Sequence, residues 1–252
     1  MTQTAKKSPF SMNVDLMHGP IFKNLLLFML PIFISNLFQQ LYNTVDTMIV
    51  GNVLGDTALA AIGSCGSIYE LLVGFGLGIG NGLAIVAARS YGAQDHDLLK
   101  KTVAGSLVIG LIASLCITLA GAVGLRPLLV LLDTPAEILA DSALYLDIYV
   151  LGLPFMFFYN IATGIFSALG DSKTPFYFLA VSSLSNIGVD ILFVAGFHMG
   201  VAGVAWATFL CQGVSCILAM VVVFRRMKAI PTNRKTVWFS WNMLGKIAVV
   251  AI

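Results

Sequence analysis

The chain has 252 residues and a formal net charge of +2, and 58% of its residues are hydrophobic while only 10% are charged. A soluble domain carries roughly 25% charged residues, so this composition excludes a soluble enzyme, a disordered protein and a nucleic-acid binder. The relevant unit is the membrane span, which needs about 20 predominantly apolar residues.

Six long apolar stretches follow one another along the chain and predict an all-α membrane protein. The repeated ten-residue alternation of a transmembrane barrel is absent. Start signals support the helices: Thr134-Pro135-Ala136-Glu137 has the pattern of a capping box, Thr174-Pro175 repeats the cap followed by proline, and Asp56 or Thr57 can cap the second helix. We expect helices at 21–50, 57–88, 100–125, 136–167, 174–196 and 200–224, with a seventh beginning near Met243.

Basic residues predict the orientation. If the loops alternate between two sides, 13 of the 14 Lys and Arg residues fall on one side and only Arg126 on the other. The positive-inside rule places that side in the cytoplasm, and the N-terminus lacks the features of a cleavable signal peptide. We therefore predict a multi-pass protein of the plasma membrane, with a cytoplasmic segment at 1–20, a six-helix unit at 21–224, a cytoplasmic linker at 225–242 and the start of another span at 243–252.

Two other compositional features have structural explanations. The four cysteines lie in apolar stretches without metal-ligand spacing, so we interpret them as small core residues. The glycine-rich segment 74–82 lacks the Gly-Lys-Ser/Thr sequence of a phosphate loop. Its glycines Gly74, Gly78 and Gly82 recur every four residues, which predicts close helix packing.

Ionisable residues inside a membrane are functional candidates because burying them unpaired is costly. The candidates here are Asp46, Glu70, Asp147 and Asp190. Helical spacing places polar residues in stripes, one on each of four helices, and such stripes must face one another or water. This predicts a hydrated or ligand-filled central cavity. The stripes are Asn36, Gln39, Gln40, Asn43, Asp46 and Thr47; Tyr145, Tyr149, Gly152, Tyr159, Asn160 and Thr163; Ser182, Asn186 and Asp190; and Thr208, Gln212 and Ser215.

The depth of each polar residue in the membrane indicates which of them can form one site. At about 1.5 Å per residue, Asp190 lies about 24 Å above the cytoplasmic start of its helix and Thr208 about 12 Å below the outer end of the next. Both depths fit one site in the outer half of the membrane, where Asp46 also lies. Asp46 could instead cap a turn near its helix end, and Glu70 could be a second proton site or a structural anchor. Asp147 lies off the polar stripe and is interpreted as interfacial.

Several fragments together resemble the multidrug and toxic compound extrusion (MATE) family. They are QQLYNTVDTMIVGNVLG (39–55), ALAAIG (58–63), GNGLAIVAARSYGA (80–93), SALGDSKTP (167–175), SSLSNIGVDILF (182–193) and GVAGVAWAT (200–208). The resemblance covers nearly all of the chain and implies the N-terminal six-helix lobe of a two-lobed transporter. It also implies export of bulky, often cationic drugs, driven by inward flow of sodium ions or protons, with no other cofactor and no enzymatic activity.

The resemblance also implies a cation site. It maps to Asp46, Asn186, Asp190 and Thr208, the residues that spacing and depth select, with Tyr145 and Asn160 taking part from the fourth helix. Carboxylate, amide and hydroxyl oxygens suit a proton or a sodium ion, and Pro31 can kink the first helix. The chain departs from the family in containing one lobe, so we expect transport to require the missing C-terminal lobe.

Two other functions are compatible with a polar cavity in a membrane protein. A lipid-linked saccharide flippase of the wider superfamily should have several basic residues in its cavity to hold a pyrophosphate, and no Lys or Arg lies within a predicted span core. An intramembrane aspartyl protease would use Asp46 and Asp190. Such enzymes resemble one another in Tyr-Asp and Gly-x-Gly-Asp motifs, whereas Asp46 follows Val45 and Asp190 follows Gly188-Val189.

Overall fold

The computed structural model describes residues 20–230. Its helical segments are α1 (Ile21–Leu54), α2 (Asp56–Ser64), α3 (Gly66–Gly92), α4 (His96–Leu131), α5 (Ala136–Ala168), α6 (Lys173–Ile191), the π-helical η1 (Leu192–Gly196) and α7 (Gly200–Ala229). Six of them, counting α6 and η1 as one, are long and apolar enough to cross a membrane. The predicted all-α membrane fold is confirmed. The N-terminal segment 1–19 and the predicted seventh helix lie outside the described residues.

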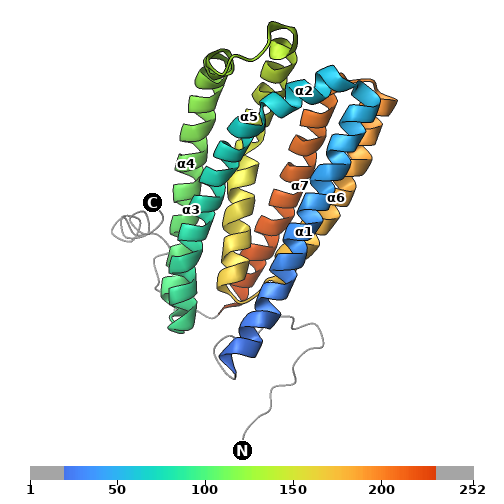
Figure 1. The fold of residues 1–252 in the computed structure, drawn as a ribbon. Helices are drawn as coiled ribbons and strands as arrows, with labels where there is room; N and C mark the ends of the chain where they lie inside the picture. Colours follow the sequence, from blue (N-terminus) through green and yellow to red (C-terminus); the bar gives the residue numbers. More distant parts are fainter. Residues whose placement is uncertain (1–19, 231–252) are drawn as a thin grey trace, which may run out of the picture.

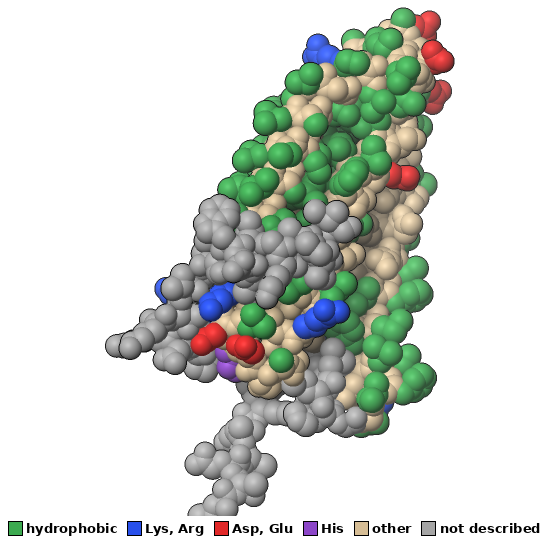
Figure 2. Space-filling model, turned by 90° about the vertical axis from the view of Figure 1, so that its left-hand side faces the viewer, with side chains coloured by type: hydrophobic (Ala, Val, Ile, Leu, Met, Phe, Trp, Pro, Cys, Tyr) green, Lys and Arg blue, Asp and Glu red, His purple; other side chains and the backbone are tan. Residues whose placement is uncertain are grey.

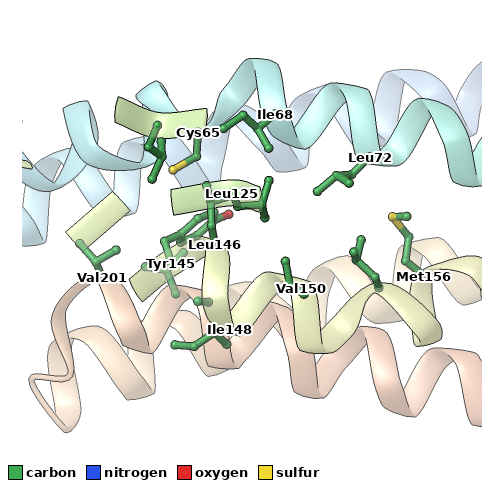
Figure 3. Close-up of a cluster of buried hydrophobic side chains, with 14 of the residues drawn as sticks. Cys65, Ile68, Leu72, Leu125, Tyr145, Leu146, Ile148, Val150, Met156 and Val201 are labelled. Carbon is green, nitrogen blue, oxygen red and sulfur yellow. The ribbon is translucent and has the colours of Figure 1, made fainter. Parts of the chain in front are cut away.

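Helix α5 lies at the centre of the bundle. It packs against α3, α4 and α7, whereas α1 packs chiefly along α6 (Figure 1). Half of the most apolar window of α5 is buried, compared with none of the corresponding window of α1. Two clusters of buried side chains surround α5, and Figure 3 shows the one around Leu146 and Tyr145. The centre of the lobe is therefore built on α5, while α1 is a peripheral helix held mainly by one neighbour.

The predicted helix 57–88 is two helices in the structure. The break falls at Cys65, and Gly55, with a φ of 85°, joins α1 to α2. Ser142 of α5 donates a hydrogen bond to the carbonyl oxygen of Ala61 at 3.0 Å, and the Cys65 thiol donates to the carbonyl oxygen of Ser142 at 3.5 Å. These two bonds join the break to α5, and hydrophobic periodicity does not indicate them.

The helix starts also differ from the predicted caps. Helix α5 begins without a side-chain cap, so the predicted capping box at Thr134 does not form. Helix α6 is capped by Asp171, whose Oδ1 accepts from the N–H groups of Lys173 and Thr174 at 3.1 and 3.0 Å. Asp171 is buried and pairs with Arg226 at 2.6 Å. This ion pair connects the α5–α6 loop to α7. Helix α7 continues to Ala229, so it extends past residue 225, where the linker was predicted to begin.

Close helix packing on α3 involves Gly80 and not the predicted Gly74 and Gly78. A Cβ atom built on Gly74 or Gly78 would meet nothing within 4 Å. A Cβ on Gly80 would instead lie 3.0 Å from the Asn160 carbonyl oxygen, and one on Gly164 would lie 2.8 Å from that of Gly80. The prediction for Gly74 and Gly78 is therefore wrong, because equal spacing along a helix does not show which face meets a neighbour. Backbone contact between α3 and α5 requires Gly80 and Gly164.

The outer surface is largely apolar between the two ends of the molecule. Figure 2 shows the face formed largely by α4, with hydrophobic side chains along the flank and most of the charged side chains towards the ends. Exposed residues of α4 include Leu119 and Val123, which are 68% and 80% exposed. Such a surface is stable only in contact with lipid or with another apolar surface.

Candidate cation-binding site

The candidate site lies between α1 and α6, which pack side by side. Asp46 projects from α1, and Asn186 and Asp190 lie one turn apart on α6. Asn186 is 3% exposed, Asp190 is fully buried and Asp46 is partly buried. Asp190 is in the last turn of α6, which is followed directly by η1, and π-helical turns occur frequently at functional sites. The packing of α1 on α6 thus brings two carboxyl groups together in the interior.

Asn186 connects these carboxyl groups to α7. Its amide nitrogen donates to Asp190 Oδ2 at 3.1 Å and to the Tyr42 hydroxyl, and its amide oxygen accepts from the Thr208 backbone N–H at 3.3 Å. The carboxyl groups of Asp46 and Asp190 are within hydrogen-bonding reach of each other. The Oδ1 atoms of both are buried and have no hydrogen-bond partner among residues 20–230. Two oxygen atoms are therefore available to a ligand.

The electrostatics of this pair favour a bound cation. Neither carboxyl group makes an ion pair within the described part of the chain. Two charged carboxylates in a low-dielectric interior repel each other and lose their hydration. A proton shared by the pair or a hard cation between the two relieves that repulsion, and hard cations prefer oxygen ligands. In residues 20–230 no three His, Cys, Asp or Glu side chains form a group that could hold a metal. The donor set thus suits a proton or a sodium ion better than a transition metal.

Three tyrosines surround the site on the α3 and α5 side. Tyr145 stacks on Tyr149 with ring centroids 6.5 Å apart, and Tyr149 lies 4.9 Å from Tyr69. Tyr145 is close enough to both Asp46 and Asp190 to interact with them electrostatically, and Tyr69 is close enough to Asp46. Tyr145 is itself part of the buried core around α5, so this core extends up to the carboxyl pair.

A cavity of about 190 Å³ with a mixed polar and apolar lining, here called the lobe cavity, adjoins the site. Its polar lining comes from all four predicted stripes, and no Lys, Arg, Asp or Glu is among its lining residues. At about 30 Å³ per water it could hold roughly six water molecules, whereas pockets for drug-sized ligands measure about 300–1,000 Å³. The lobe cavity alone is too small for a bulky drug. The polar side chains that line it are Gln39, Tyr69, Tyr149, Tyr159, Asn160, Ser182, Thr208, Gln212 and Ser215.

The predicted site residues differ in how close they lie to the carboxyl pair of Asp46 and Asp190. Asp46, Asn186 and Asp190 lie together, Tyr145 lies beside them, and Thr208 meets Asn186 through its backbone while lining the cavity. Asn160 lies in the cavity wall, against the glycines of α3. Of the other polar residues of the α1 stripe, Gln39 lines the cavity, whereas Gln40, Asn43 and Thr47 line a separate surface hollow.

The other ionisable candidates lie apart from the carboxyl pair. Glu70 lines a groove between α3 and α4. Asp147 pairs with Arg126 at 2.6 Å near the end of the bundle, with side-chain exposures of 40% and 70%. Pro31 lies inside α1, where it removes one backbone hydrogen bond. Our reading of the sequence missed Tyr42 and Tyr69. The signal for Tyr42 was present, because it precedes Asp46 by four residues and so shares its helix face.

Comparison with known proteins places this geometry in a family. The sequence profile of the MatE family matches residues 31–192. Two relatives from Bacillus subtilis (strain 168) are the probable multidrug resistance proteins YoeA, 34% identical over 82% of this chain, and YpnP, 30% identical over 94%. The chain spans about half the length of these relatives, 46% of YoeA and 54% of YpnP.

Solved structures show the same fold. A MATE protein in the straight conformation matches with a TM-score of 0.83 and 26% identity, over 95% of this chain and 53% of that one. A transporter of the MOP superfamily from Pyrococcus furiosus matches with a TM-score of 0.85 and 26% identity, also over 95% and 53%. The six apolar helices and the match over residues 31–192 show that this chain is a multi-pass membrane protein and belongs to the MatE family.

Proposed function

We propose that the chain is the N-terminal lobe of a two-lobed multidrug exporter, driven by inward movement of a sodium ion or a proton. The unpartnered buried oxygens of Asp46 and Asp190, beside the lobe cavity, are the observation that carries this proposal. The names of YoeA and YpnP support multidrug resistance as the activity of the whole protein. The chain's half-length match to them supports a second, C-terminal lobe as its partner.

The proposed coupling works through the position of α1. This helix packs mainly on α6, so the interaction between Asp46 and Asp190 bears directly on how closely the two helices approach. A bound cation neutralises the repulsion and favours close packing, whereas its release favours separation. Pro31 lacks the backbone hydrogen bond that would stiffen α1 at that point. Cation binding thereby alters the cavity wall, where Gln39 of α1 lies, and this links the cation to the drug.

The proposed substrate is a bulky organic cation that binds largely outside the small lobe cavity. The carboxyl pair next to the cavity favours positive charge, and the space needed for a drug has to include the region facing a second lobe. The absence of Lys and Arg from the lining residues of this cavity argues against a flippase for pyrophosphate-linked saccharides. The pair of neighbouring aspartates alone would suit a protease. The similar solved structures include transporters, however, and neither Asp46 nor Asp190 lies in the Tyr-Asp or Gly-x-Gly-Asp motif of such proteases.

Asp190→Asn provides the decisive test. In vesicles containing the two-lobed protein, we expect it to abolish ethidium efflux driven by an imposed sodium or proton gradient while leaving the amount of folded protein unchanged. Asp46→Asn should have the same effect. Asp147→Asn is the matched control and should retain most of the activity, because Asp147 pairs with Arg126 away from the site. Wild-type efflux by both Asp46→Asn and Asp190→Asn would overturn the proposed site, and comparing the two gradients identifies the coupling ion.

The proposed topology and the need for a second lobe can be tested separately. A cysteine introduced near Lys100, at the exposed Ala93 of the α3–α4 loop, should react with a membrane-impermeant maleimide only from the cytoplasm. One at the exposed Asp133 should react only from outside, since basic residues mark the inner side. Cells expressing residues 1–252 alone should show no ethidium efflux. Efflux by this chain alone would instead indicate that two copies supply both lobes.

A further inference from the structure

A second feature that could hold a cation is the groove between α3 and α4, which run side by side (Figure 1). Its volume is about 690 Å³, more than three times that of the lobe cavity and within the range of drug-sized pockets. The floor is open because Gly74 and Gly78 have no side chains, and a Cβ on either would meet nothing within 4 Å. The groove has room for a ligand with several rings.

The lining of this groove is apolar except for one carboxylate. Leu71, Phe75 and Ile117 are among the hydrophobic residues that form its walls, and Glu70 is its only ionisable side chain apart from the Cys116 thiol. Glu70 is exposed, and it makes no hydrogen bond or ion pair with any residue between 20 and 230. It lies about 6 Å along α3 from Gly66, the first residue of that helix. A positive partner stabilises a negative charge on an apolar, membrane-length helix.

We propose that this groove binds a lipophilic organic cation directly from the bilayer, with Glu70 as counter-ion. The ligand class follows from charge complementarity: the walls match an apolar body, and the carboxylate matches a positive charge without a hydrogen-bonding requirement. The site is separate from the Asp46–Asp190 pair, which lies between α1 and α6. The inference rests on the proposed function only in taking the ligand from the class of exported drugs.

Tetraphenylphosphonium is a suitable probe, because it carries a delocalised charge among four phenyl rings. Its binding is measured by equilibrium dialysis against the 252-residue chain in nanodiscs of phosphatidylcholine and phosphatidylglycerol. We expect Glu70→Gln to weaken binding about fivefold, the size expected for one partly exposed ion pair. Gly74→Leu and Gly78→Leu should weaken it further by filling the groove. Triphenylphosphine oxide, a neutral compound of similar shape, should bind equally to the wild type and to Glu70→Gln.

Matched controls separate the groove from general effects of charge and side-chain size. Glu137→Gln removes an exposed carboxylate at the start of α5, and Gly124→Leu adds a side chain at an open position of α4 outside the groove. Both should bind the probe as the wild type does. Every variant is first shown to be helical by circular dichroism and monodisperse by gel filtration, so a loss of binding does not reflect misfolding.

Three outcomes would overturn the inference: no saturable binding to the wild type, unchanged binding by Glu70→Gln and both glycine variants, or loss of binding when phosphatidylethanolamine is added to the nanodiscs. The last result would assign the groove to a lipid ammonium group. Failure here is distinguishable from failure of the proposed function. If Asp190→Asn abolishes efflux while Glu70→Gln binds normally, the exporter stands and the groove does not. If probe binding depends on Glu70 but the two-lobed protein shows no efflux, the groove stands and the exporter does not.

Discussion

The contact between Gly80 of α3 and Gly164 of α5 leads to a prediction whose size can be worked out from the structure. In Gly164→Ala the new Cβ atom would lie 2.8 Å from the Gly80 carbonyl oxygen and 3.2 Å from the Ala84 Cβ atom. The first of these atoms belongs to the backbone, so rotation of a side chain cannot relieve the clash. The two helices have to move apart, and α5 loses close packing along its contact with α3.

Gly78→Ala is the matched control. It makes the same chemical change on α3, but its Cβ atom would meet nothing within 4 Å. Both substitutions gain the same helix propensity, about 1 kcal/mol relative to glycine, so this contribution cancels between them. The remaining difference is the cost of overpacking, typically about 1–3 kcal/mol. For a domain of this size, that corresponds to a Tm about 2–12 °C lower for Gly164→Ala than for Gly78→Ala.

Thermal unfolding of the purified variants in one detergent, followed by the loss of the monodisperse gel-filtration peak, measures this difference. Gly78→Ala should unfold about 2–4 °C above the wild type because it gains helix propensity without a clash. Gly164→Ala should unfold clearly below Gly78→Ala. Equal Tm values for Gly164→Ala and Gly78→Ala would refute the backbone contact between α3 and α5. Efflux by the two-lobed protein should fall with Gly164→Ala as well, because Asn160 packs against Gly80 and lines the lobe cavity.

Two further predictions concern individual polar contacts. Tyr42→Phe removes the hydroxyl that contacts Asn186. It should therefore raise the concentration of coupling ion that gives half-maximal efflux about fivefold, which corresponds to about 1 kcal/mol for one hydrogen bond. An unchanged dependence of efflux on the ion concentration would contradict this prediction. Asp171→Asn leaves the Arg226 guanidinium without its carboxylate and should lower the free energy of unfolding by about 2 kcal/mol. The corresponding change at the exposed ion pair, Asp147→Asn, should cost less than about 1 kcal/mol. Thermal unfolding compares these two variants, and equal losses would show that burial of Asp171 contributes nothing.

The membrane fold and much of the candidate site could be predicted from the sequence. Apolar stretches of membrane length define spanning helices by themselves, because lipid requires each span to satisfy its own backbone hydrogen bonds. Helical periodicity then placed Asp46, Asn186 and Asp190 on polar faces, and the cost of exposing such faces to lipid implied that they meet. Their proximity in the structure follows from these local and environmental constraints.

Only the tertiary structure decided which neighbour each face meets. Periodicity places Gly74, Gly78 and Gly80 around the axis of α3, but the position of α5 determines that Gly80 makes the close contact and that the other two lie in an open groove. The break at Cys65 depends in the same way on hydrogen bonds to α5, more than 70 residues away in the chain. A sequence determines the direction of a side chain relative to its own helix. Its partner is determined by how the helices pack, which depends on contacts between residues far apart in the chain.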